Sequence, residues 1–290
     1  MAQDWIEKSA AGISLRSVTY VEVLHCDIEN VSGGLFFGNH SDHGKALYNT
    51  ITRYSMDGSR IISDDILFAY NTIRGCMKVD DNHDDAIQSY SQTSDYQVGT
   101  TVIKDVIVRG NLIIGIDDPE HPLAGSPQGI GCFDGFFENW IVENNVVIVN
   151  HYHGISFYGM KNSKILNNTV IDQVPGDDIS PWIMVTDHKD DRPSENCIVA
   201  NNIAFRTVSA SGNNVTEHHN YIFGHSNYDS IYYTFVDPDN LNFDLVSNEF
   251  TQRHLINLGE YFPGTVSSEK DIQEKKRNDA PDLGAFEYTK

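Results

Sequence analysis

The chain has 290 residues, of which 41 are acidic and 20 are basic, so its formal net charge at neutral pH is -21. A surface this negative repels nucleic acid and anionic membranes, and we expect neither as a partner; an acidic polymer would bind only where cations bridge the two. The hydrophobic content of 40% is typical of a soluble fold, and no apolar run is long enough to cross a bilayer.

The first residues, MAQDWIEKSAAG, lack the long apolar core of a signal peptide, so a secretion signal could only have preceded them. The four cysteines of the chain are widely separated and form no CxxC pair. A zinc site made from them is therefore disfavoured, and we expect buried thiols that act as small apolar side chains.

One sequence element recurs along the chain: an apolar stretch, one or two asparagines, then a second apolar stretch. It reads ALYNTITRY, LFAYNTIRG, VIVRGNLIIG, WIVENNVVIV, SKILNNTVID and CIVANNIAF. The marking asparagines are Asn49, Asn71, Asn111, Asn145, Asn168 and Asn202, which lie 22, 40, 34, 23 and 34 residues apart. The shortest steps indicate a repeat of 22 or 23 residues, and the longer steps indicate the same repeat with an insertion.

The apolar stretches of the repeat alternate with a period of two and are rich in Val and Ile, which predicts short strands. In WIVENNVVIVNHYHGISFYG three strands fit, at 140–143, 146–149 and 154–158. The asparagine marks the corner between the first two, because Asn tolerates left-handed backbone and its amide bonds to the local chain. Stacked corners predict an all-β fold, a right-handed parallel β-helix with three strands per coil.

We expect a single domain over residues 1–290. Residues 1–11 form a partial N-terminal cap, residues 12–225 form the coils, and residues 226–290 form the last coil and a C-terminal segment. The last coil is expected at FVDPDNLNFDLVSNEF, and the chain closes with APDLGAFEY.

The third strand of each coil aligns along the stack as GISL, GLFFG, RIISD, AIQSY, GIGCFD, GISFYG and WIMVTD. The alignment predicts an inward column of Ile13, Ile87, Ile130, Ile155 and Ile183. It predicts outward neighbours that include Gln88, Ser156, Met184, Tyr90, Phe133, Tyr158 and Thr186. Outward aromatic rings suit the C–H faces of sugars, although such rings also shield a sheet beneath long loops.

Long insertions flank this strand on both sides. Residues 92–105 and 188–195 leave its C-terminal end, whereas residues 77–84, 117–127 and 174–181 enter its N-terminal end. Loops on both sides of one sheet build a groove, and insertions on one face of a repeat protein usually form the binding face.

The most acidic stretch of the chain, KVDDNHDDAIQSYS, lies at the middle of this predicted groove. Four aspartates so close together repel one another unless a cation neutralises them, and Ca²⁺ prefers carboxylate and carbonyl oxygens. Asp80, Asp81, Asp84 and Asp85 are therefore predicted to hold Ca²⁺. A solvated acidic turn and a purely structural calcium site remain as alternatives.

The asparagine-cornered coils resemble the pectate-lyase-like superfamily of β-helix proteins over about residues 12 to 225. NHDDAIQ, residues 82–88, is similar to the calcium motif of one bacterial pectate-lyase family and to the Asp-Asp pair of polygalacturonase-type hydrolases. The resemblance implies a secreted or periplasmic enzyme that degrades an acidic polysaccharide, with catalytic calcium beside the groove sheet.

A lyase acting on a uronate removes the C5 proton and expels the C4 oxygen, which requires a cation on the carboxylate and a base. The candidate bases are Lys78, His83, His153 and Tyr158. His153 has a suitable ordinary pKa, whereas nearby carboxylates would raise the pKa of Lys78. The predicted substrate-binding residues are Gln88, Tyr90, Phe133, Arg74, Lys189 and Arg192, the three cations among them approaching from loops.

Other functions remain open. A glycoside hydrolase would use paired carboxylates from Asp84, Asp85 and Asp134, and HGIS at 153–156 is similar to a polygalacturonase segment. That family's Arg-x-Lys element has no clear match, and a coil intervenes between the acidic pair and the histidine. A non-catalytic carbohydrate-binding solenoid, such as an adhesin or a phage tail fibre, would need no base at all. A trimeric phage tail-spike-like depolymerase is a further alternative.

Overall fold

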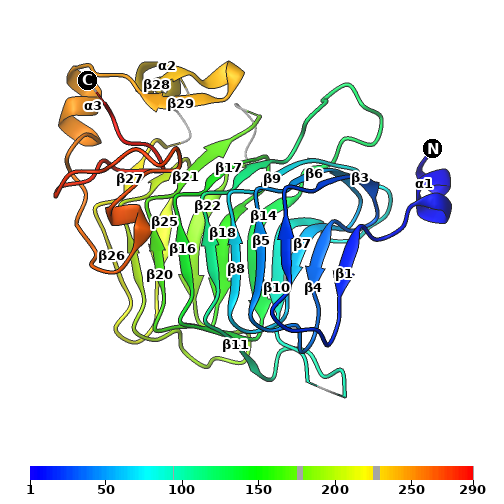
Figure 1. Cartoon of the computed structure of the whole chain (residues 1–290). Helices are drawn as coiled ribbons and strands as arrows, with labels where there is room; N and C mark the ends of the chain where they lie inside the picture. The colour runs from blue at the N-terminus through cyan, green and yellow to red at the C-terminus, as the bar shows by residue number, and fades with distance from the viewer. Residues whose placement is uncertain (94, 175–178, 225–228, 290) are drawn as a thin grey trace.

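In the computed structural model, which describes residues 1–93, 95–174, 179–224 and 229–289, the chain winds into a stack of coils that run from right to left in Figure 1. Each coil contributes one strand to each of three long parallel sheets. The right-handed parallel β-helix predicted from the asparagine repeat is confirmed.

Sheet one contains the strands that were aligned from the sequence. In order along the stack it consists of β1 (Ile13–Leu15), β4 (Leu35–Phe37), β7 (Asp57–Ile61), β10 (Asp85–Tyr90), β14 (Gln128–Asp134), β18 (His153–Tyr158), β22 (Trp182–Thr186) and β25 (Val208–Ala210).

Sheet two follows sheet one along each coil. It consists of β2 (Glu22–Leu24), β5 (Gly44–Leu47), β8 (Ile66–Ala69), β12 (Ile107–Arg109), β16 (Ile141–Glu143), β20 (Lys164–Leu166), β23 (Ile198–Ala200) and β26 (Thr216–His218).

Sheet three closes the coil. It consists of β3 (Asp27–Val31), β6 (Thr50–Tyr54), β9 (Thr72–Cys76), β13 (Leu112–Ile114), β17 (Val146–Val149), β21 (Thr169–Asp172), β24 (Ile203–Ala204) and β27 (Tyr221–Ile222). A shorter parallel sheet of β11 (Val102–Lys104), β15 (Phe136–Glu138) and β19 (Met160–Lys161) lies between sheets one and two on the central coils.

The inward column of sheet one is built largely as the alignment predicted. Ile87, Ile130, Ile155 and Ile183 are successive partners and are fully buried. The alignment of β7 was wrong by two residues, because Ser59 rather than Ile61 occupies the column. The buried Ser59 hydroxyl donates to the Leu35 carbonyl (2.7 Å), which satisfies a polar group in an otherwise apolar column.

The corner asparagines form a continuous ladder of hydrogen bonds. Each side-chain amide donates to the side-chain oxygen of the next, at 2.9–3.0 Å, through Asn49, Asn71, Asn111, Asn145, Asn168, Asn202 and Asn220. The left-handed backbone falls one residue earlier than we expected, at Tyr48, Tyr70, Gly110, Asn144, Asn167, Asn201 and His219. The ladder asparagine therefore supplies hydrogen bonds, and its predecessor makes the turn.

The C-terminal part of the chain covers the outer face of sheet three on the later coils (Figure 1). The stretch expected to be the last coil instead pairs antiparallel, as β28 (Phe235–Asp237) and β29 (Asn242–Leu245). Among its described residues, this segment also contains α2 (Ser230–Thr234), η2 (Pro238–Asn240), α3 (Glu249–His254) and η3 (Val266–Ser268). Phe235, Phe243 and Leu255 pack there on outward apolar side chains of sheet three such as Ile148 and Ile203.

At the opposite end of the stack, α1 (Ala2–Lys8) lies beyond the first coil and buries none of its residues. Cys76, Cys132 and Cys197 are buried free thiols, and Cys26 is half-buried. In the described ranges, no helix has the length and apolar character needed to cross a membrane.

Candidate functional site

The acidic stretch divides into an exposed half and a buried half. Asp80 and Asp81 lie exposed on the turn before β10, where Asp80 accepts hydrogen bonds from Asn82. Asp84 and Asp85 are 6% and 1% exposed at the start of β10. Of the four predicted calcium ligands, the structure therefore brings only Asp84 and Asp85 together inside the molecule.

A third buried carboxylate, Asp57, joins them from the preceding coil. Asp57 begins β7 and is paired in register with Asp85, which in turn pairs with Gln128 at the start of β14. Sequence reasoning missed Asp57 because the alignment of β7 was shifted by two residues. The signal that would have found it is the motif of β7 itself: DGSR has the same Asp-x-x-polar spacing as DAIQ in β10.

Each carboxylate has a different partner. Asp57 accepts from Arg60 Nε (2.5 Å) and from the Asp85 backbone N–H (3.0 Å), and Asp84 forms a salt bridge with Lys78 (3.1 Å). Asp85 accepts only from the neutral amide of Gln88 (2.9 Å), and within the described part of the chain no salt bridge reaches it. Among these three carboxylates, Asp85 is thus the one without a salt bridge.

We define the acidic cluster as Asp57, Asp84, Asp85 and Gln128. The pKa values of its three carboxyl groups are all raised, which indicates that the nearby positive charge does not balance them. Burial raises the pKa of Asp57 to about 6 even though Arg60 opposes the shift. Burial likewise raises the pKa of Asp84 to about 6 against the effect of Lys78. The pKa of Asp85 is raised well above its ordinary value by burial and then by the charge of Asp57.

Several buried oxygens of the acidic cluster lack a hydrogen-bond partner: Asp84 Oδ1, Asp85 Oδ1 and Gln128 Oε1. Two of them gather over Gly131, where an added Cβ would lie 2.2 Å from Asp85 Oδ1 and 3.0 Å from Gln128 Oε1. The missing side chain of Gly131 makes room for these oxygens. Unpaired buried acceptors are costly in a folded protein, so the set is suited to an external cation.

The donor set fits Ca²⁺ in its chemistry, since all its members offer oxygen, the ligand atom that Ca²⁺ prefers. No choice of one oxygen from each of Asp57, Asp84 and Asp85 keeps all three within 4.8 Å of one another. For all three carboxylates to bind one ion, these side chains must therefore rotate.

His153 lies two strands further along sheet one, on β18, at a spacing of about 10 Å from β10. Its Nδ1 is 2.9 Å from Ser156 Oγ, which also accepts from the indole N–H of Trp182 (3.0 Å). Burial and the neighbouring His151 lower the pKa of His153 to about 4, so the ring is neutral at physiological pH. When Nδ1 donates to Ser156, Nε2 remains unprotonated and able to accept a proton.

The remaining predicted catalytic groups are more dispersed. His83 is exposed on the turn, and Lys78 is held by Asp84 and the Asn82 carbonyl. Tyr158 packs edge-on against Phe133, whose ring also contacts His153 at a centroid distance of 4.8 Å. Among the candidate bases, His153 and Tyr158 therefore both lie beside Phe133, an outward aromatic ring of sheet one.

Asp134 does not join the acidic cluster. It lies at the C-terminal end of β14, in register with Tyr90, and forms a salt bridge with Lys189 (2.7 Å). Since Tyr90 is five residues beyond Asp85 along β10, the two carboxylates are separated by about 16 Å along the strand direction.

The predicted substrate-binding residues also divide. Gln88, Tyr90 and Phe133 line a hollow of about 270 Å³ on the outer face of sheet one, together with Ser89, Val98 and Asp134. Arg74 lies on sheet three and pairs with Asp117, and Arg192 pairs with Asp190 while its guanidinium lies over Phe136. Neither arginine lines this hollow.

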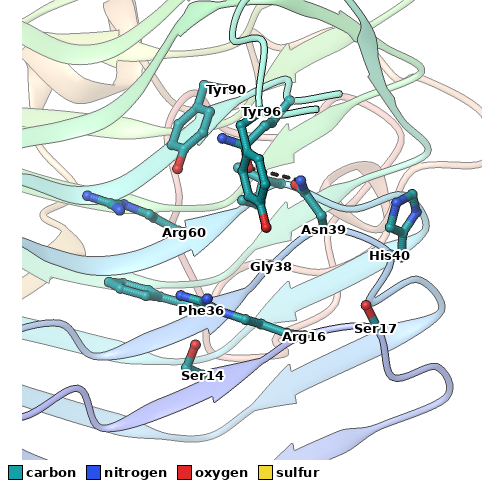
Figure 2. Close-up of a pocket in the computed structure, with 12 residues that line it drawn as sticks. Ser14, Arg16, Ser17, Phe36, Gly38, Asn39, His40, Arg60, Tyr90 and Tyr96 are labelled. Atoms are coloured by element: carbon teal, nitrogen blue, oxygen red, sulfur yellow. Dashed lines mark hydrogen bonds between the residues drawn. The ribbon is translucent and has the colours of Figure 1, made fainter. Parts of the chain in front are cut away.

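A larger hollow of about 470 Å³ continues toward the N-terminal coils and shares Tyr90 with the first. Figure 2 shows Tyr90 and Tyr96 on one side of it and Phe36 and Arg16 on the other. Arg60 links this hollow to the acidic cluster, because its Nε donates to Asp57 while its guanidinium lies 5.0 Å from the Phe36 ring. Sequence reasoning missed Arg16 and Arg60.

We call the two hollows together the groove. The insertion at residues 92–105 supplies Tyr96 and Val98 to it, as expected for a loop that leaves the C-terminal end of β10. The insertion predicted at 174–181 contains residues 175–178, which lie outside the described residues.

Comparison with solved structures finds two lyases that are similar to this chain to different degrees. A pectate lyase, Pel9A, superimposes with a TM-score of 0.52 at 17% sequence identity, over 92% of this chain and 70% of that one. An alginate lyase from Paenibacillus sp. str. FPU-7 has a TM-score of 0.35 at 12% identity, over 73% of this chain and 80% of that one. No protein-family model and no curated protein matches the sequence. The chain has the fold of the pectate-lyase-like β-helix proteins.

Proposed function

We propose that this protein is a polysaccharide lyase that binds an acidic, uronate-containing chain in the groove and cleaves it by calcium-assisted β-elimination. The observation that carries the proposal is the buried, cation-deficient cluster of Asp57, Asp84 and Asp85 beside the groove. A solved protein of the same fold is named a pectate lyase, which agrees with an acidic polysaccharide as the substrate.

The charge of the molecule supports a cation-dependent mode of binding. With a net charge of -21, the protein as a whole repels a polyuronate. Arg16 and Arg60 make the larger hollow locally positive, and Ca²⁺ at the acidic cluster would add positive charge a short distance along sheet one. A uronate chain lying along the stack would then meet cationic groups with its carboxylates and aromatic rings with its sugar faces.

In β-elimination, a base takes the C5 proton, a double bond forms between C4 and C5, and the C4–O bond breaks. When bound, Ca²⁺ would neutralise the uronate carboxylate and stabilise the charge that develops as the proton leaves. Asp57, Asp84 and Asp85 would hold the ion, and Gln128 could add its free oxygen.

His153 is the preferred base among the four candidates. Its ring is neutral over the physiological range, and in the tautomer whose Nδ1 donates to Ser156 the free electron pair is on Nε2. The oxygen that leaves C4 takes its proton from a donor near it; Tyr158 and Lys78 are the candidates on this face.

A hydrolase built on Asp84, Asp85 and Asp134 is less compatible with this geometry. Glycosidases place their two carboxyl groups about 5 to 9.5 Å apart, whereas Asp134 lies at the far end of the strand from Asp85 and is engaged by Lys189. Because the proposed substrate is an external polymer, the protein would act in the secreted or periplasmic compartment.

The deciding experiment incubates the protein with pectate, alginate and other acidic polysaccharides, in Ca²⁺ and in chelator. Elimination produces a conjugated unsaturated uronate, which is followed by its ultraviolet absorbance, and hydrolysis produces reducing ends without that absorbance. The proposal expects absorbance that requires Ca²⁺. Reducing ends alone would favour hydrolysis, and binding without any product would favour a carbohydrate-binding solenoid.

A further inference from the structure

We propose that His218, His219 and Glu260 form a binding site for a divalent transition-metal ion of the Zn²⁺ class, which fastens the C-terminal segment to the last coil. The Nδ1 atoms of the two histidines are 2.9 Å apart. Glu260 Oε2 lies 3.4 Å from His218 Nδ1 and 3.7 Å from His219 Nδ1. This site is far along the stack from the groove and is independent of the proposed lyase function.

The spacing of the three atoms matches one metal ion. Zn²⁺ binds imidazole nitrogen and carboxylate oxygen at about 2.0–2.2 Å, so neighbouring ligands in a tetrahedral site are roughly 3.3 Å apart. The three separations bracket that value, and all three ligand atoms lie within 4.8 Å of one another. Two nitrogens and one oxygen also favour a transition metal over Ca²⁺.

The backbone explains how adjacent histidines converge. Successive side chains of a strand point to opposite faces, so His218 at the end of β26 and His219 after it would normally diverge. His219 is the left-handed corner residue of the last coil, with φ 51°, and this turn brings its ring beside that of His218. In the two preceding coils, Asn201 and Asn167 hold the equivalent corner.

The third ligand is positioned by the corner of the preceding coil. The Asn201 side chain donates to the Glu260 carbonyl (2.8 Å) and accepts from the Glu260 N–H (2.9 Å). These two bonds fix the Glu260 backbone one coil away from His219, and the His218 ring lies beside the buried Phe262. The site is therefore assembled from two segments that are joined only when the C-terminal segment is docked.

The exposure of the site leaves room to complete the coordination of an ion. The side chains of His218, His219 and Glu260 are 33%, 47% and 48% exposed, so water can supply the remaining ligand. An ion that binds only the docked arrangement stabilises it by mass action. The expected consequence is a terminal coil that is anchored more firmly in the presence of the metal.

The test is a calorimetric titration of the full chain, freed of any affinity tag, with Zn²⁺ in excess Ca²⁺ so that the acidic cluster is occupied. His219→Asn is the sharpest variant, because asparagine occupies this left-handed corner in the coils before it and should preserve the fold. Glu260→Gln removes the charge at nearly constant shape. His43→Ala, which removes an exposed histidine that pairs with Asp65 and stacks on Tyr20, is the matched control.

We expect one Zn²⁺ per chain at this site, with affinity at least about tenfold weaker in His219→Asn and Glu260→Gln and unchanged in the control. Zn²⁺ should raise the Tm of the wild type and of the control but not that of the two variants. Equal Zn²⁺ affinity in all four proteins would overturn the site. Weakened binding without any difference in Tm would overturn the anchoring role.

Discussion

Two rows of buried polar side chains run along this solenoid, and they differ in how well they are satisfied. In the asparagine ladder, every amide from Asn49 to Asn202 donates to the next side chain and to a backbone carbonyl. In the acidic cluster, Asp84, Asp85 and Gln128 each bury an oxygen without a partner. The side chains of the ladder satisfy one another's hydrogen bonds within the protein, whereas the free oxygens of the acidic cluster need an added cation as their partner.

The comparison separates a structural polar group from a functional one on physical grounds. A buried amide whose hydrogen bonds are all made fixes the register of the coils. Its burial costs little free energy of folding, because these hydrogen bonds replace those with water. A buried carboxylate without a counter-ion lowers the stability of the empty protein. Substitution should therefore have opposite effects on stability in the two rows.

The largest expected effect is on activity. Asp85→Asn removes the carboxylate that has no cationic partner, so we expect elimination to fall at least about 1,000-fold because the ion is lost. In chelator the same variant should melt at a higher temperature than the wild type, since a buried charge has been removed. Asp27→Asn, on an exposed residue of sheet three, is the control and should change neither quantity.

His153→Ala should lower kcat by about 100-fold or more, because a positioned general base contributes on that scale. Its calcium affinity should equal that of the wild type, which distinguishes it from Asp85→Asn. A kcat close to that of the wild type would remove His153 from the mechanism and direct attention to Lys78 or Tyr158.

The ladder should respond in stability rather than in activity. Asn145→Ala removes the acceptor of the Asn111 backbone N–H and side-chain amide, and one donor to the Val108 carbonyl, at about 1–3 kcal/mol for each buried group left unsatisfied. Chemical denaturation should therefore show a loss of several kcal/mol in the free energy of unfolding. The calcium affinity of the folded protein should be unchanged. If Asn145→Ala were as stable as the wild type, the ladder would not have the structural role assigned to it.

The pH dependence of stability should depend on calcium. The folded pKa of Asp57 and of Asp84 is about 6, above the ordinary value of 3.8, so in chelator these groups favour folding fully below about pH 3.8. That contribution is lost as pH rises to about 6. Added Ca²⁺ competes with protons, so the rise in Tm on adding Ca²⁺ should be large at about pH 7.5 and small at about pH 5. A calcium effect independent of pH would argue against these carboxylates as ligands.

The smallest predicted effect concerns substrate affinity. Arg16 is an exposed cation of the larger hollow, and its contact with a uronate carboxylate is screened by water. Arg16→Gln should therefore raise KM roughly fivefold, for a loss of about 1 kcal/mol, and leave kcat unchanged. Arg16→Lys should restore most of the affinity, whereas a fall in kcat alone would contradict a role in binding.

The coils could be predicted because two independent signals agreed: Asn recurred at the corners, and Ile87, Ile130, Ile155 and Ile183 recurred at one position of the aligned strands. The sequence also placed Asp84 and Asp85 at the entrance to a strand beside the groove. These features recur at corresponding positions of the repeat, so they can be recognised without knowing the pairing between coils.

The remainder of the site depends on pairing between coils. Asp57 and Arg60 come beside Asp85 only through the register of β7. This register is hard to infer from the sequence, because Ser59 stands where the other strands of the column have an apolar residue. The separation of Asp134 from Asp85, and the exposure of Asp80 and Asp81, likewise follow from where each strand begins and ends. The path of the C-terminal segment over sheet three has no repeat that would predict it.

The central claim is that the acidic cluster holds Ca²⁺ beside the groove, and calorimetric titration of chelator-treated protein with Ca²⁺ tests it most directly. The account predicts one ion bound through Asp57, Asp84 and Asp85, with affinity that is lost in Asp85→Asn and kept in Asn145→Ala. Absence of calcium binding by the wild type, or equal affinity in Asp85→Asn, would contradict it.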